Sequence, residues 1–537
     1  MTYCSIRKFN NAFLWLALIT LVVSGCSKEA KDYKADSDEK VYKILDKKWD
    51  PNTHGVKTNY KISDVEPDPQ AIKVERAVPA SGILTLTDAV AIATAHSREY
   101  QLEKENLYLS ALDLNLTRHD FETQFFGGGS ANYQYDDATS MQQINASPMV
   151  GFSRMLQDGT LITTDLTLAW VDILSGDFRS GLDGIFNAAI NKPLLRGSQR
   201  EIVMENLTQA ERTTLYQIRI FSRYRKIFVV NIATLYYTTL LQHDRLINSE
   251  DNYAILTGVC DKAKKLRDVG RLPQYELDEA LQDKLHAYDK IIEEEKLYKQ
   301  MLDEFKLVLG LPTDCEFELD DGELLILKSK KMDKPSFSCS ESITVAMNNR
   351  LDLLNAFDAI DDAARKVMVK EDAFRAQLNI VAGTSTNTAE RRQSLRGLNN
   401  LDSQINAGVQ LDLGLDKSFA QWDYRNSLII LNQARRFYQQ TQDQTKLEVR
   451  NAYRDLTEAM DRHDVQVENL KFAKKRFDNT MTLLKYSRTN TRDVLDAQED
   501  YFDAQKAAAE TAVNYTIAML NFYRDTDVMQ IKPDGMW

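Results

Sequence analysis

Two long stretches of the chain place apolar residues at every third or fourth position, which is the spacing of one face of an α-helix. In the first stretch, about 199–269, this face is marked by five large side chains: Phe221, Tyr224, Phe228, Ile232 and Leu235. The second stretch covers about 418–486, and each stretch is followed by a turn and another helical segment, about 274–309 and about 492–526. The pattern predicts two helical hairpins, whose long helices each extend about 105 Å at about 1.5 Å per residue.

Shorter segments ahead of each hairpin alternate apolar and polar residues, which predicts strands within about 130–191 and about 377–415. In the clearest segment the apolar positions are Ile405, Ala407, Val409, Leu411, Leu413 and Leu415. This alternation suits a strand that crosses a membrane, although a half-buried strand of a soluble protein has the same pattern. The stretches 136–160 and 172–184 have no counterpart in the second half, so we expect loops there. Gly127–Gly129 is expected to end the preceding helix and to act as a hinge into the first strand.

The order of these elements occurs twice: a helix, two strands, a long helix and a second helix. The segment Val345–Leu353 matches Ile92–Tyr100, which lies 253 residues earlier, and the apolar positions stay in step beyond it. Self-similarity at a fixed offset indicates a tandem repeat. The predicted division is 84–310 for the first repeat, 311–336 for a connecting segment at the equator, 337–528 for the second repeat and 529–537 for a C-terminal tail.

The N-terminus has the pattern of an export signal. Arg7 and Lys8 precede the apolar run Ala12–Val23, which is long enough for a signal peptide and short for a membrane-spanning helix. The small residues before Cys26 resemble the lipobox of bacterial lipoproteins, which implies cleavage after residue 25 and acylation of Cys26, palmitate included. Ser27 after it favours the outer membrane. The alternative is an ordinary cleaved signal; in either case, 26–83 is expected to be a polar linker.

Composition narrows the class of protein. The chain of 537 residues has only 21 Gly and 10 Pro, which favours few turns and long elements. Its formal net charge is −12 and no basic stripe alternates with aromatic residues, so nucleic-acid binding is disfavoured. Beyond the N-terminus there is no run of about 20 apolar residues, which argues against membrane-spanning helices.

The duplicated order of elements resembles the TolC-like outer-membrane efflux proteins over about 84–528. Three short segments support the resemblance: Ala89–Tyr100, Pro193–Gly197 and Asp493–Gln498. The resemblance implies a mainly α-helical fold with a membrane β-barrel part. A homotrimer with four strands per chain would form a 12-stranded β-barrel and a long periplasmic α-barrel.

The function implied is a passive exit channel for efflux or type I secretion. Such a channel works with a periplasmic adaptor (membrane fusion) protein and an inner-membrane pump. The alternative is a structural coiled-coil envelope lipoprotein without transport activity, but a tether has no use for the alternating strands. The sequence does not identify the cargo, because the wall of a duct selects solutes by size and charge rather than by chemical identity.

In relatives, the two acids of the last motif line the narrow inner end of the pore, and these correspond to Asp493 and Asp496, with Tyr486 nearby. A shift of 217 residues places Glu276 and Glu279 at the equivalent positions of the first hairpin. Repeated by threefold symmetry, such carboxylates would form a ring that favours cations and a periplasmic gate. The alternative is that the four acids merely suit exposed helix starts, where a carboxylate is favoured by the helix dipole.

The remaining candidate chemistry is sparse. Cys315 and Cys339 flank a short segment, so in an oxidising compartment they could form a disulfide or remain two free thiols. Cys260 lies in a helical stretch and is expected only to pack. The six histidines show no zinc-binding spacing, and no phosphate loop or nucleophile motif occurs. We therefore expect no enzyme activity, no cofactor and no metal site.

Overall fold

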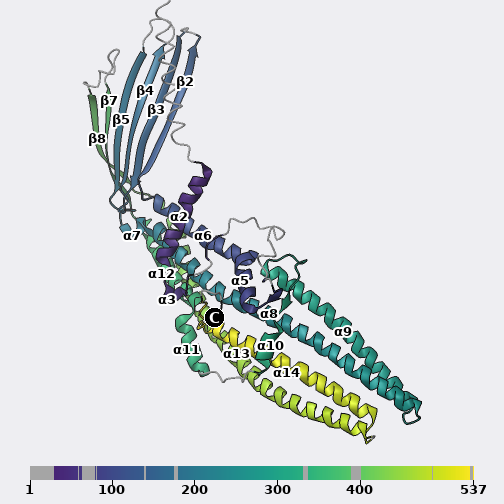
Figure 1. The fold of residues 1–537 in the computed structure, drawn as a ribbon. Helices are drawn as coiled ribbons and strands as arrows, with labels where there is room; N and C mark the ends of the chain where they lie inside the picture. Colours follow the sequence, from purple (N-terminus) through teal and green to yellow (C-terminus); the bar gives the residue numbers. More distant parts are fainter. Residues whose placement is uncertain are drawn as a thin grey trace, which may run out of the picture.

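The computed structural model describes residues 29–57, 60–62, 79, 81–137, 141–173, 180–329, 337–388, 401–486, 488–532 and 536. Cys26 and the signal segment lie outside these residues. The chain is elongated, with a β-sheet at one end and two helical hairpins at the other (Figure 1). Among the described residues, no helix is both long enough and apolar enough to cross a membrane.

The sheet has six antiparallel strands in the order β2-β3-β4-β5-β7-β8. Their bounds are Gln124–Asp136 (β2), Met141–Met155 (β3), Leu161–Ile173 (β4), Ser180–Pro193 (β5), Gln377–Thr388 (β7) and Leu401–Asp412 (β8). Within this sheet the strands pair in chain order, and the β5–β7 pair joins the two halves of the sequence.

The prediction of four strands per chain is wrong, because β3 occupies most of the stretch expected to be a loop over 136–160. The segment was missed because Pro148 interrupts its alternation, and proline cannot donate to a strand ladder. The prediction that Gly127–Gly129 ends a helix is also wrong, since the triplet lies within β2. Gly129 pairs with Pro148, and a Cβ on Gly129 would lie only 3.2 Å from the Pro148 Cα. A glycine there lets the two strands approach each other.

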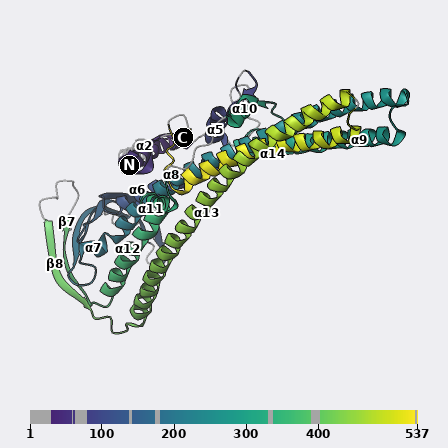
Figure 2. The same ribbon diagram turned by 90° about the horizontal axis from the view of Figure 1, so that it is seen from below.

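The helical end consists of two hairpins. The first is α8 (Glu205–Asp268) and α9 (Gln274–Leu309), and the second is α13 (Ser418–Lys485) and α14 (Thr491–Asp525). Proline-free sequence permits such lengths, and Pro273 stands at the N-cap of α9, where no helical N–H is lost. Gly310 ends α9 in the left-handed region, with φ of 78°. Figure 2 shows α14 lying along the first hairpin.

Equivalent elements ahead of the hairpins recur at the same spacing. Helix α5 (Leu86–His96) corresponds to α11 (Cys339–Asn349), and α6 (Arg98–His119) corresponds to α12 (Leu351–Asp372). Both ends of each pair differ by 253 residues (339 − 86 and 372 − 119). β2 and β7, the first strands of the two halves, also begin 253 residues apart. β3 and β4 are therefore the additional hairpin of the first half.

The polar segment before residue 84 is not merely a linker in the part described. Residues Ala30–Lys48 form α2, and Pro51–His54 form the short α3. Helix α2 buries Val41, Ile44 and Leu45 in the main core, which also contains the apolar face of α8. In the connecting segment, β6 (Glu318–Leu319) pairs in parallel with β1 (Ile83–Leu84), and α10 (Asp321–Ser329) follows.

Candidate functional site

The sheet presents one apolar and one polar face. The strand register places six large apolar residues, one on each strand, on the same side: Phe125, Val150, Leu166, Phe186, Ile380 and Val409. All six are exposed, with Phe125 81% and Val409 69% accessible. Apolar side chains from every strand thus form a continuous exposed surface, which is unusual for a protein surrounded by water.

The opposite face is mainly polar along the same strands, although Phe126, Met149 and Leu161 also lie on it. Asn187 on β5 donates a hydrogen bond of 2.9 Å to Asp165 on β4, and Gln143 on β3 donates one of 3.0 Å to Gln134 on β2. Polar residues also occupy this face of β8, where Gln404, Asn406 and Gln410 alternate with the apolar set. The sheet can therefore separate a hydrocarbon surrounding from water.

At the far end, Asp493 serves the local structure of the second hairpin turn. Its carboxylate accepts hydrogen bonds from the Thr489 hydroxyl at 2.6 Å and from the Asn490 backbone N–H at 3.4 Å. The exchange between Asn490 and Asp493 forms a capping box at the start of α14. The Thr489 and Asn490 hydrogen bonds lower the pKa of Asp493 below its usual value.

Acidic residues from the two hairpins meet at a seam between α9 and α14. Glu279 on α9 forms an exposed ion pair with Arg492 on α14, with 3.8 Å between their charged atoms. Burial raises the pKa of Asp283, and the negative charges of Glu279 and Asp496 raise it further. The structure therefore brings Glu279 and Asp496 to one seam, together with Asp283, which sequence reasoning missed.

The other two residues predicted for the tip lie on separate helix ends. Glu276 is in the first turn of α9, and Tyr486 follows the end of α13 with 72% of its side chain exposed. Beneath the tip, small and medium apolar residues join the hairpins: Leu256, Val259, Cys260, Ala280, Ala287, Val494 and Leu495. The Cys260 thiol donates to the Ala280 carbonyl at 2.9 Å, so Cys260 is a packed residue of this contact.

The possible disulfide between Cys315 and Cys339 is not formed, and both are free thiols. The physical reason is that the two residues belong to different packing units. Cys315 is buried in the main core, whereas Cys339 begins α11, which packs against α13. Among the described residues, no group of three or more metal-binding side chains is close enough to hold an ion.

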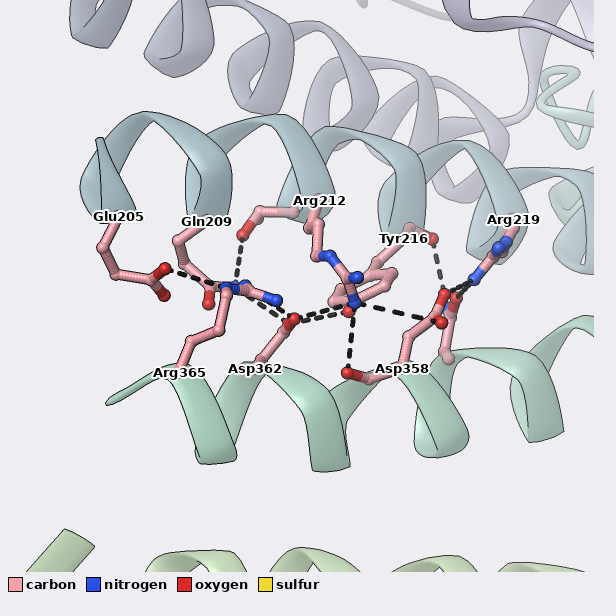
Figure 3. Close-up of polar contacts among 10 residues, drawn as sticks. Glu205, Gln209, Arg212, Tyr216, Arg219, Asp358, Asp362 and Arg365 are labelled. Carbon is pink, nitrogen blue, oxygen red and sulfur yellow. Dashed lines mark hydrogen bonds and ion pairs between the residues drawn. The ribbon is translucent and has the colours of Figure 1, made fainter. Parts of the chain in front are cut away.

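Polar side chains of α8 and α12 form a hydrogen-bonded seam that sequence reasoning missed (Figure 3). We call it the α8–α12 seam, and its members are Glu205, Gln209, Arg212, Tyr216, Arg219, Asn355, Asp358, Asp362 and Arg365. Asp362 lies at its centre. Its carboxylate accepts hydrogen bonds from Arg365 at 2.9 Å, Arg212 at 3.0 Å and Tyr216 at 2.7 Å.

The seam joins the first half of the chain to the second. Arg219 donates to Asp358 at 2.6 Å, and Arg365 donates to Glu205 at 2.8 Å, so ion pairs cross between the helices at both ends. Burial and the neighbouring Asp362 raise the pKa of Tyr216, which keeps its hydroxyl a donor. The sequence signal was a second stripe on α8 at spacings of three and four, composed of polar residues.

Comparison with known proteins gives structural neighbours only. No family model and no curated protein sequence matches the chain. The Campylobacter jejuni CmeC outer membrane channel is 13% identical with a TM-score of 0.59, over 84% of this chain and 86% of that one. The outer membrane protein VceC from Vibrio cholerae is 11% identical with a TM-score of 0.58, over 82% and 95%.

The open state of the Neisseria gonorrhoeae MtrE outer membrane channel is a third neighbour, with 12% identity and a TM-score of 0.57. It matches 82% of this chain and 88% of its own. Because the structures superpose over most of both chains while the sequences are so little alike, the similarity is one of fold. The chain therefore has the fold of the TolC-like outer-membrane channels.

Proposed function

We propose that three copies of this chain form a passive export channel, in which the strands cross the outer membrane and the helices form a duct through the periplasm. The observation that carries the proposal is the two-faced sheet. Its exposed apolar face requires a hydrocarbon surrounding, and its polar face suits a water-filled lumen. A single copy leaves strand edges open, so assembly is needed to satisfy the backbone in a membrane.

The proposal includes a periplasmic adaptor protein that contacts the hairpin tips and, through it, an inner-membrane pump. Efflux and type I secretion both fit such a duct. The tip seam of Glu279, Asp283 and Asp496 is proposed as the gate, with Asp493 holding the turn in shape. Acylation of Cys26 is proposed as an additional anchor, since several acyl chains make membrane attachment stable.

A structural tether of the envelope is the competing role. Long helices suit a tether as well as a duct, but a six-stranded sheet with an exposed apolar face serves no purpose in a tether. The duct is therefore favoured. The proposed role is passive transport without catalysis.

The test uses membranes from cells that make the full chain. We expect the protein in the outer-membrane fraction, a trimer that dissociates only on heating in detergent, and ion conductance after reconstitution into planar bilayers. A monomer that stays in the soluble fraction and does not conduct would refute the proposal.

A matched pair of variants tests the orientation of the sheet. Val409→Arg puts a charge on the apolar face, where arginine at the middle of a bilayer costs about 2–4 kcal/mol per copy. Gln410→Arg puts the same side chain on the polar face, one residue away. We expect Val409→Arg to reduce the amount of assembled trimer in the outer membrane, whereas Gln410→Arg assembles normally and changes only ion selectivity. Equal effects of the two variants would contradict the orientation.

A further inference from the structure

The two outer strands of the sheet, β2 and β8, each have a partner on one side only. Strand β2 pairs with β3, and β8 pairs with β7, along 13 and 12 residues respectively. Each of the four strands between them has two neighbours. Within the described chain, the other sides of β2 and β8 thus present rows of backbone N–H and C=O groups that can pair with another strand.

Neither edge has the features that discourage strand pairing. β2 contains no charged residue from Gln124 to Tyr135, and the charges of β8 are confined to its ends, at Asp402 and Asp412. Proline is also absent from both strands. Natural edge strands usually carry lysine, proline or an inward charge, or are very short. These two edges are therefore suited to being covered by a partner.

The two edges are complementary to each other. Six strands that alternate in direction leave β2 and β8 antiparallel, so β2 of one copy can continue the antiparallel order next to β8 of another. The faces also agree, because Phe125 and Tyr133 on β2 lie on the same side of the sheet as Ile405 and Val409 on β8. A second copy of this chain thus provides both the direction and the apolar face required.

We propose that β2 of each copy pairs with β8 of the next, and that three copies close a barrel of 18 strands (3 × 6). This inference rests on the proposed trimeric channel. It replaces the barrel of 12 strands that was expected when each chain was predicted to supply four. The additional strands are β3 and β4, which take their places between β2 and β5.

The strand number sets the width of the exit. With neighbouring strands about 4.8 Å apart and tilted about 40°, a closed barrel of 18 strands has a backbone diameter of about 36 Å, against about 24 Å for 12 strands. The cross-section inside the backbone therefore roughly doubles. Barrels of 16–18 strands leave an open aqueous channel, whereas small barrels are filled by side chains.

The lining of this barrel fits unselective passage of bulky polar cargo. The polar face is formed mainly by amides, hydroxyls and glycine, and Asp165, one of its few charges, already accepts a hydrogen bond from Asn187. The outer exit would therefore not be the narrow point of the duct.

Disulfide cross-linking tests the edge pairing in the full chain. Cys260, Cys315 and Cys339 are replaced by alanine, and Ser130→Cys on β2 is combined in turn with Gln404→Cys, Asn406→Cys or Gly408→Cys on β8. These positions all lie on the polar face, near the middle of each strand. We expect one combination to give covalent dimers and trimers that survive heating, and a reductant should separate them into monomers. The matched control, Ser130→Cys with Asn187→Cys on the interior strand β5, should give none.

Electron microscopy of the detergent-solubilised trimer counts the strands directly. We expect 18 strands in the full chain. Deleting residues 141–173 removes β3 and β4 but leaves both edges, so that variant should remain a trimer and its barrel should narrow by about one third. A conducting trimer with 12 membrane strands, or one without β2–β8 cross-links, would overturn this inference while the proposed channel stands. A protein that neither trimerises nor conducts would refute both.

Discussion

Replacing Asp362 by asparagine removes one charge from the centre of the α8–α12 seam while keeping the side chain's volume. The Asp362 side chain is only 8% exposed, and Arg212 and Arg365, which are 31% and 20% exposed, both pair with it. Breaking a buried ion pair by removing one partner costs about 3–5 kcal/mol. Because both arginines can partly rehydrate and keep Asp358 or Glu205 as a second partner, we expect a loss of about 2–3 kcal/mol in the free energy of local opening.

Hydrogen–deuterium exchange of the purified full-length protein measures this loss where it occurs. Since 1.36 kcal/mol corresponds to a factor of ten, amides of α12 and of α8 near Arg212 should exchange about 30 to 160 times faster in Asp362→Asn. Amides of α9 and α14 at the tip should keep their rates. Asp361→Asn is the control, because Asp361 is the exposed neighbour on the same helix. Unchanged exchange in Asp362→Asn, or equal acceleration in the control, would refute the claim that this network holds the two halves together.

Three further predictions concern single residues. Burial lowers the pKa of Lys104 to about 8, so its buried charge destabilises the fold below that pH, and this penalty disappears as the pH rises from about 8 to 10.5. Lys104→Met should therefore raise the temperature at which the proposed trimer dissociates most at neutral pH and least near pH 10.5. Gly310→Ala places a Cβ at φ of 78° and against the His96 carbonyl, so thermal denaturation should show that the free energy of unfolding falls by more than about 1 kcal/mol. Gly258→Ala, where a Cβ meets no other atom within 4 Å, should cause no such fall. Asp493→Ala removes the side-chain half of the capping box at the start of α14 that Asp493 supplies, and it should speed proteolysis at the second hairpin turn. Asp496→Ala should leave proteolysis unchanged and alter the cation selectivity of the proposed channel.

The helical hairpins and the duplicated order of elements could be read from the sequence, because long periodic segments without proline have few competing structures. Apolar residues at helical spacing, such as Phe221 and Phe228, are indeed buried in the core. The strand β3 could not be read, because Pro148 breaks its alternation and its partner strand contains three glycines. Helix α2 was also missed, because the residues it packs on the core (Val41, Tyr42, Ile44 and Leu45) lie within an otherwise polar segment.

The sequence pattern did not predict the network around Asp362, for a different physical reason. Charged residues on a helix usually face water, so a polar stripe gives no sign of burial until its partner helix is known. The stripe on α8 becomes meaningful only when α12, more than 100 residues later, supplies acids at matching positions. Similarly, Asp493 looked like a gate residue from its motif, yet its first contact is with the turn that precedes it.

The distribution of packing along the molecule indicates where a duct of this kind would open. Near the sheet, α8 is held on one side by the α8–α12 seam and on the other by large core residues such as Tyr100, Phe221 and Tyr236. Toward the tip, the same helix is held by a smaller set in which Ala280, Ala287 and Val494 replace the aromatic residues, and the ion pair of Glu279 with Arg492 is exposed. Exposed ion pairs contribute about 1 kcal/mol or less, and small side chains bury little apolar area. The packing therefore holds the tip less strongly than the sheet end, which supports the proposed gate at the tip.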